Sequence, residues 1–352
     1  MQLVINTFGT SLRRKGDRFV VKSPARQTPV EISAHKIQSL VIATGAHFSS
    51  NVIQLAAEHN IDVVFLDKLG RPIARVWQTK MGSTAAIRRR QLEAAETDEA
   101  MQFVRGWTTS KIENQLGFLR ELQARRPEHA ETFTGPLGTI QECREKVAAC
   151  TGTVDEQRHT LMGLEGAAGR AYFQCLSPLM PQEYRFHGRS RQPAVDAFNA
   201  MLNYSYGVLY SQVERALILA GLDPFVGFLH TDDYNKRSLV FDMIEPFRIL
   251  GDRTTVLFFT GRRAKQEYFR VVPGGVELSP EGRADLMTKF NERLDRTVRY
   301  PVQSDKSEKK YRKIHQRMVI QYEAHALANA MLGRHDLPKI VETEQLWKEP
   351  ET

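Results

Sequence analysis

The spacing of apolar residues changes once along this chain, and that change limits the folds it can adopt. Up to residue 76, apolar residues form short runs separated by turn residues, as in Leu40–Ile42 and Ile61–Leu66. Such runs are typical of β-strands. From Ile87 onward, apolar residues recur at the spacing of one helix face, with Glu, Gln, Lys and Arg filling the faces expected to be exposed. The pattern predicts an α+β protein, with a small N-terminal β-rich domain followed by a larger all-helical domain.

A polar stretch of small residues separates the two patterns and predicts a linker over residues 77–86. We therefore expect a β-domain at 1–76, a helical domain at 87–335 and a tail at 336–352. Within the first domain, Lys15-Gly16-Asp17 predicts a turn between the strands Leu3–Ile5 and Phe19–Val21.

The overall composition favours a cytoplasmic globular protein. Apolar residues make up 41% of the 352 residues and charged residues 26%, which is a globular balance. The net charge of +8 favours a polyanionic partner. The 3 cysteines form no C-x-x-C pair and predict reduced thiols.

No apolar run reaches the roughly 20 residues that a membrane span needs, and the start of the chain lacks a signal-peptide layout, so we expect no contact with membranes.

Two carboxylates and one imidazole are the first candidates for chemistry. Asp242 and Glu245 would lie on one helix face if the segment through Glu245 is helical, and the loop after His230 could bring its imidazole to that face. Such a ligand set suits Mg²⁺ or Mn²⁺. The alternative is a helix start, with Asp242 as the N-cap and Glu245 closing a capping box.

A further acid, Glu165, lies among Gly163, Gly166 and Gly169 in a predicted helix. Each glycine costs a helix interior about 1 kcal/mol, so three of them need a reason. One reading is close access of a phosphate backbone to Glu165. The other is a tight helix crossing with Glu165 merely solvated.

Basic residues accompany these segments. Single clusters usually form a solvated face, but together they could line a groove that neutralises phosphates. The predicted nucleic-acid contacts are Arg189, Arg191, Arg248, Lys289 and Arg293.

Four segments, in this order and spacing, resemble the CRISPR adaptation integrase family, the endonuclease/integrase that inserts new spacers into a CRISPR array. They are residues 65–70 (FLDKLG), 162–166 (MGLEG), 196–204 (DAFNAMLNY) and 230–248. Any one of them would be weak, but together they are specific, and the resemblance covers almost the whole chain.

The resemblance implies roles for single residues. In the family, a Glu of the first helical motif, a His and the last acid of the third motif bind the metal, which here are Glu165, His230 and Glu245. Asp242 matches a nearby acid needed for activity, so these four are the predicted catalytic residues. The family often has Asp at the position of Glu245, and this departure changes the reach of that ligand. The expected cofactor is Mg²⁺ or Mn²⁺.

The resemblance also implies the reaction and the partners. The 3′-hydroxyl of a short DNA duplex would attack a phosphodiester of the repeat, which needs no ATP because one phosphodiester replaces another. With water as the nucleophile, the same site would hydrolyse DNA. The implied partners are double-stranded DNA (spacer precursor and CRISPR repeat), a second copy bound through the β-domain, and the small companion adaptation protein.

Two other functions fit the residues. One is a structure-selective DNase that cuts branched DNA with the same site and water as the nucleophile. The other is a non-catalytic, basic DNA-binding or assembly protein in which Glu165 and Glu245 only cap and pack.

Overall fold

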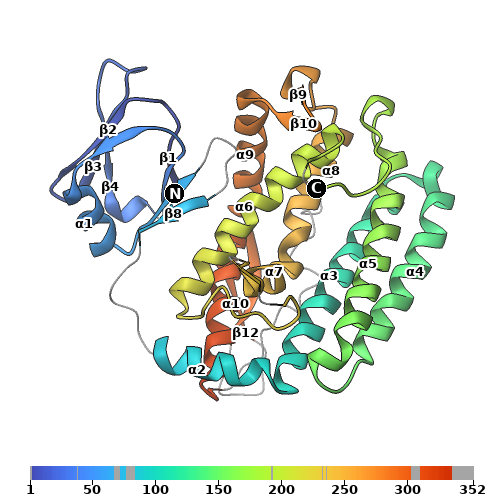
Figure 1. Ribbon diagram of the computed structural model, residues 1–352. Coiled ribbons are helices and arrows are strands. Elements are labelled where there is room, and N and C mark those ends of the chain that lie inside the picture. The colour runs from blue at the N-terminus through green and yellow to red at the C-terminus, as the bar shows by residue number, and fades with distance from the viewer. Residues whose placement is uncertain are drawn as a thin grey trace. The chain divides into compact units, whose positions relative to one another are not determined.

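Strands β1 to β8 precede all the long helices in the computed structural model (Figure 1). The structure describes residues 2–37, 39–66, 72–76, 84–191, 193–231, 233–234, 236–302 and 310–334. The chain divides into two units, Met1–Gly82 and Ser83–Thr352, and each has its own hydrophobic core. The predicted α+β class, with a β-rich part before a helical part, is confirmed.

Two four-stranded sheets form the N-terminal unit. One has the order β1-β5-β7-β8, in which β1, β5 and β7 are parallel and β8 is antiparallel to β7. The other has the order β4-β3-β2-β6. The element bounds are β1 Gln2–Ile5, β2 Thr10–Lys15, β3 Arg18–Lys22, β4 Val30–Ser33, η1 Ala34–Lys36, β5 Ser39–Ile42, β6 Ala46–Phe48, α1 Ser50–Glu58, β7 Asp62–Leu66 and β8 Pro72–Arg75.

The turn predicted at Lys15-Gly16-Asp17 joins β2 to β3 rather than Leu3–Ile5 to Phe19–Val21. Gly16 has φ +56°, which glycine tolerates at little cost. Phe19 is fully buried in this hairpin. The prediction overlooked β2 because Leu12 is the only apolar residue in this strand, TSLRRK.

Nine helices and two strand pairs are described in the second unit. Helix α2 begins at Thr84, so the end of the predicted linker is helical, while residues 77–83 of that linker lie outside the described part. The antiparallel pairs β9–β10 and β11–β12 were not expected in a domain predicted to be all-helical. The bounds are α2 Thr84–Ala95, α3 Glu99–Ala124, α4 Ala130–Ala148, α5 Val154–Leu176, α6 Ala197–Leu219, α7 Ser238–Met243, η5 Glu245–Phe247, α8 Arg248–Thr260, β9 Phe269–Val272, β10 Gly275–Leu278, α9 Pro280–Leu294, β11 Thr297–Val302, β12 Lys310–His315 and α10 Gln316–Met331.

Helix α3 is the centre of the helical unit. It has 26 residues and packs against α4, α5, α8 and η5, and Figure 1 shows α3, α4 and α5 side by side. Contrary to the expectation of polar residues on an exposed face, polar side chains in the middle of α3, including Lys111 and Asn114, are buried. No helix in the described ranges combines the length and the apolar character needed to cross a membrane.

Candidate active site

Two glutamates from distant segments meet on one buried ammonium group. Glu165 comes from the middle of α5, Glu245 from η5 and Lys111 from α3. The Lys111 Nζ lies 2.5 Å from Glu245 Oε2 and also contacts Glu165 Oε1 closely. The side chain of Glu245 is 7% exposed and that of Glu165 is 25% exposed. The structure therefore places two carboxylates around one cation at the edge of the helical core.

Arg248 fixes the other oxygen of Glu245. Its Nε donates to Glu245 Oε1 at 2.9 Å, and its Nη2 donates to the Tyr210 hydroxyl at 2.9 Å. The guanidinium also stacks over Tyr206, 4.7 Å from the ring centroid. Burial alone would raise the pKa of Glu245, but Arg248 and Lys111 outweigh it and hold that pKa at about 2. Glu245 is thus an ionised carboxylate at neutral pH.

Asp242 organises the loop that carries His230. Its carboxylate accepts hydrogen bonds from the backbone N–H groups of Phe228, Leu229 and His230 at 2.6, 3.0 and 3.0 Å. The His230 Nδ1 lies 2.6 Å from Asp242 Oδ1. This contact favours the tautomer with hydrogen on Nδ1, which leaves the Nε2 lone pair available to a ligand. The structure therefore gives Asp242 a positioning role.

The capping interpretation of Asp242 and Glu245 is wrong. Helix α7 continues to Met243, and α8 starts only at Arg248, without a side-chain hydrogen bond at its N-cap. The partners of Asp242 precede it in the chain, and those of Glu245 are side chains. Neither acid closes a capping box.

Arg158 connects the His230 loop to the helix that bears Glu165. Its Nη1 donates to the carbonyl of Phe228 at 3.2 Å and to that of Leu229. Arg158 lies seven residues before Glu165, which is about two turns of helix and nearly the same face. The segments that carry Glu165 and His230 are thus joined directly.

The glycines beside Glu165 line an open stretch of α5. Among the described residues, a Cβ at Gly163 or Gly169 would meet nothing within 4 Å, and one at Gly166 would meet only the Arg170 Nη1 at 3.6 Å. The tight helix crossing considered from the sequence is therefore absent from this part of the described structure. The glycines leave open space on the stretch of α5 that carries Glu165.

The chemistry of the donor set fits a divalent cation. Glu165, Glu245 and the free nitrogen of His230 offer two carboxylates and one imidazole, a set that suits Mg²⁺ or Mn²⁺. The ammonium of Lys111 already shows that the site accepts positive charge between its carboxylates. Within the described ranges, the ligand atoms of this set do not gather within 4.8 Å of one another. Binding an ion here would require Lys111 to withdraw.

The predicted DNA contacts differ in how far they are buried. Arg248 and Arg293 are buried, at 8% and 4% exposed, and their contact with DNA stays a prediction. Arg189 is half-buried, and its guanidinium donates to Asn199 Oδ1 and to an oxygen of a second asparagine on α6. Arg191 and Lys289 lie at the surface. The sequence could not distinguish the buried from the exposed basic residues, because spacing along a helix or loop does not show which neighbours cover a side chain.

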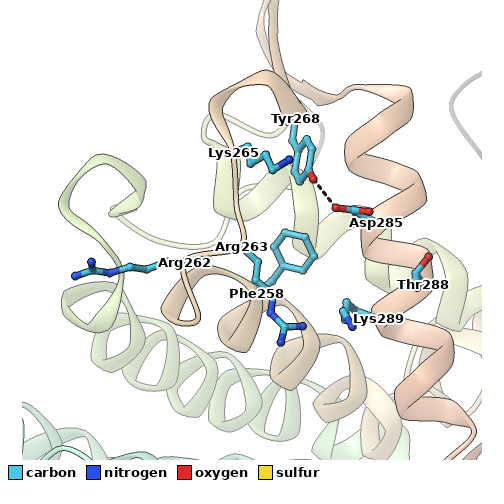
Figure 2. Close-up of a pocket in the computed structure, with 8 residues that line it drawn as sticks. All are labelled: Phe258, Arg262, Arg263, Lys265, Tyr268, Asp285, Thr288 and Lys289. Carbon is cyan, nitrogen blue, oxygen red and sulfur yellow. Dashed lines mark hydrogen bonds between the residues drawn. The ribbon is translucent and has the colours of Figure 1, made fainter.

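Lys289 also lines a basic pocket between the end of α8 and α9 (Figure 2). The pocket has a volume of about 340 Å³ and also contains Arg262, Arg263 and Lys265. Its aromatic wall includes Tyr268, whose hydroxyl donates to a carboxylate of α9. The pocket extends the positive surface of the helical unit beyond the two glutamates.

The sequence analysis did not identify three residues of the site, which are Lys111, Asn114 and Tyr210. Asn114 donates from its amide to the carbonyl of Pro246 at 2.9 Å and so fixes the segment that carries Glu245. One signal was present: a dense run of polar residues at 108–115 interrupts the apolar pattern of a long helix. Such a run indicates a buried polar site when the helix is central.

The fold and the site define a two-domain α+β protein whose helical unit pairs two glutamates with one lysine and positions a histidine beside Asp242. The profile of the family described as CRISPR associated protein Cas1 matches residues 3–292. The chain belongs to this family, which confirms the resemblance found in its motifs.

Relatives and solved structures agree with this assignment. The "CRISPR-associated endonuclease Cas1 1" of Archaeoglobus fulgidus is 32% identical over 312 residues, covering 85% of this chain and 90% of the relative. A casposase bound to its integration product has a TM-score of 0.80 at 22% identity, covering 100% of this chain and 96% of that one. A chain of a Cas6-RT-Cas1–Cas2 complex has a TM-score of 0.72 at 22% identity, covering 100% of this chain and 36% of that one. Because identity to the two structures is low, they show the fold alone.

Proposed function

We propose that this chain is a metal-dependent DNA endonuclease/integrase that inserts new spacer DNA into a CRISPR array by 3′-hydroxyl transesterification. The observation that carries the proposal is the convergence of Glu165 and Glu245 on one cation, Lys111. The name of the Archaeoglobus relative, an endonuclease, and the likeness to a casposase bound to its integration product support the proposal.

Each residue of the site has a distinct part in the proposed reaction. Glu165, Glu245 and the Nε2 of His230 would hold Mg²⁺ or Mn²⁺. When bound, such an ion polarises the phosphodiester and stabilises the departing 3′-oxygen. Asp242 holds the imidazole in the tautomer that offers Nε2, and Arg248 holds Glu245 in place. With water in place of the DNA 3′-hydroxyl, the same site would hydrolyse a strand.

The surface near the site suits a DNA backbone. The glycines of α5 remove the side chains that would keep a phosphate away from Glu165. Arg191 and the basic pocket around Lys289 provide positive charge elsewhere on the helical unit. Each phosphate that such groups neutralise releases counterions, so binding should weaken as salt increases.

We also propose a homodimer through the β-domain and assembly with the companion adaptation protein. Two-ended insertion needs two active sites on one DNA, which a dimer provides. The likeness to a chain in a Cas1–Cas2 complex supports the second partner.

The test is strand transfer of a labelled duplex into a supercoiled plasmid that contains the repeat, with the companion protein and either Mn²⁺ or EDTA. Wild type should form a joined product with Mn²⁺ only, whereas Glu165→Gln and His230→Ala should form none. Asp242→Asn should retain activity reduced by about 10–100-fold, as for other residues that orient a metal-binding histidine. Glu142→Gln is the matched control, since Glu142 is exposed on α4 and pairs with Lys146.

The same assay separates the alternatives. A donor that ends in a 3′-dideoxynucleotide should block joining and leave cutting intact. Mn²⁺-dependent nicking of branched DNA without joining would favour the structure-selective DNase. Wild type that binds DNA but neither joins nor cuts it would favour the non-catalytic assembly protein and overturn the proposal.

A further inference from the structure

Two histidines and an aspartate meet on the surface of the N-terminal unit, apart from the glutamates of the helical unit. Asp17 lies in the β2–β3 turn, His35 lies in η1 and His59 follows the last residue of α1. The ligand atoms of these three residues all lie within 4.8 Å of one another. No other trio of this kind occurs among the described residues. Three separate segments thus bring two imidazoles to one carboxylate.

The geometry of the cluster is close to that of a tetrahedral ion site. Asp17 Oδ1 lies 3.0 Å from His59 Nε2, and Asp17 Oδ2 lies 3.4 Å from His35 Nε2. In a tetrahedral Zn²⁺ site with bonds near 2.0 Å, neighbouring ligand atoms are about 3.3 Å apart. The imidazole rings meet edge to face, with centroids 4.6 Å apart. Small side-chain rotations would therefore aim both nitrogens and one carboxylate oxygen at a common centre.

Backbone contacts hold the three segments in place. The Ala34 N–H donates to the Asp17 carbonyl at 2.9 Å, which ties η1 to the turn after β2. Asn60 adopts a left-handed conformation with φ +53°, which ends α1 and leaves His59 at the helix terminus. The ring of His59 is only 17% exposed, whereas Asp17 and His35 are mostly exposed. The site is thus built on a fixed base with an open outer side.

We propose that Asp17, His35 and His59 form a binding site for a divalent transition-metal ion of the Zn²⁺ class, with water as the fourth ligand. Nitrogen ligands favour Zn²⁺ over Mg²⁺ or Ca²⁺, which prefer oxygen. For an ion to bind, each Nε2 must present its lone pair, so a hydrogen that an Nε2 shares with Asp17 would move to Nδ1 or leave the ring. The ion would link the β2–β3 hairpin, η1 and α1, and so stabilise the N-terminal unit. The proposal is independent of the reaction assigned to the helical unit.

The test measures Zn²⁺ bound per chain by equilibrium dialysis of the untagged full-length protein, followed by elemental analysis. Wild type should bind one equivalent more than His35→Gln or Asp17→Asn, while any ion at the helical unit contributes equally to all. Both changes are at exposed side chains, so the fold is retained. His47→Gln, an exposed histidine of β6 in the same unit, is the matched control and should keep the full stoichiometry.

A second readout is the visible absorption of Co²⁺, which is intense in tetrahedral coordination. Wild type and His47→Gln should show that band, and His35→Gln should lose it. Equal Zn²⁺ uptake by all four proteins would overturn the proposal. So would a loss of the same size in His47→Gln, since it would indicate adventitious binding to surface histidines.

Discussion

Lys111 acts as the internal counter-ion of two carboxylates, and its replacement by methionine provides a quantitative test of the site. Removing one partner of a buried ion pair costs about 3–5 kcal/mol. Arg248 still pairs with Glu245, and water screens the partly exposed Glu165. We therefore expect Lys111→Met to lower the free energy of unfolding of the helical unit by about 3 kcal/mol. For a unit of this size, about 2 °C per kcal/mol gives a Tm lowered by about 6 °C.

Stabilisation of the two proteins by Mn²⁺ tests the site more specifically. Under the proposed function, an ion would have to displace the Lys111 ammonium in wild type before it reaches both carboxylates, whereas Lys111→Met lacks that ammonium. Since an ion at 100 times its Kd stabilises the folded state by about 2.7 kcal/mol, Mn²⁺ should restore most of the stability that the variant loses. At equal Mn²⁺ concentration, the variant should gain more than wild type.

The assay is thermal unfolding followed by circular dichroism, with Mn²⁺ titrated from zero and EDTA as the reference. Lys146→Met, which removes an exposed lysine from α4, controls for loss of charge and should behave as wild type. Equal Mn²⁺-dependent shifts for Lys111→Met and wild type would refute competition between lysine and metal. An unchanged Tm of the variant in EDTA would refute the role of Lys111 as counter-ion.

Three further predictions concern the helical unit. Burial raises the pKa of Asp252 from 3.8 to about 6. Between these two pH values the folded state keeps a proton that the unfolded state has lost. The free energy of unfolding of wild type therefore falls by up to about 3 kcal/mol as pH rises through this range. Asp252→Asn keeps an oxygen for the Tyr206 hydroxyl and should not show this loss. In urea unfolding it should be more stable than wild type at pH 7 but not at pH 4. A pH profile parallel to that of wild type would contradict the prediction. Glu121→Ala removes two carboxylate oxygens that accept from the buried Arg253, each at 2.7 Å. The free energy of unfolding in urea should fall by about 3–5 kcal/mol. A loss below about 1 kcal/mol would contradict a buried pair. Thr153→Ala breaks the capping box of α5 and should cost about 1 kcal/mol, with Thr153→Ser as the control that keeps the cap.

The order of the two units could be predicted from the sequence because apolar residues form short runs in the first unit and recur at helical spacing in the second. The parallel strands β5 and β7 are short apolar runs, and the long helices show one recurring apolar spacing. The pairs β9–β10 and β11–β12 could not be predicted in this way. β9 and β10 have only 4 residues each, and β12, KYRKIH, is mostly basic, so these strands are defined by the partner strand rather than by a pattern of their own.

The candidate site was predictable where its residues lie in motifs, as for Glu165 and His230, and not where burial decides the role. Lys111 looks like a surface lysine in sequence and becomes a buried counter-ion only because α3 is covered by α5 and η5. Arg248 looked like a phosphate ligand, yet its guanidinium is held by Glu245 and Tyr210. The sequence contains no direct record of which neighbours cover a helix face.

The bonds from Arg158 to the carbonyls of the His230 loop have a consequence for evolution and protein engineering. The loop is anchored up to His230 by Arg158 and Asp242. Beyond Tyr234 it is anchored again, where Arg237 pairs with Glu214 at 2.9 Å and the Ser238 hydroxyl donates to the Thr231 carbonyl at 3.1 Å. Tyr234, between these anchors, is 92% exposed. Insertions are best tolerated where the backbone is exposed and makes few bonds. Extra residues beside Tyr234 should therefore be accepted without disturbing His230, which would let homologues vary in loop length there while they keep the same chemistry.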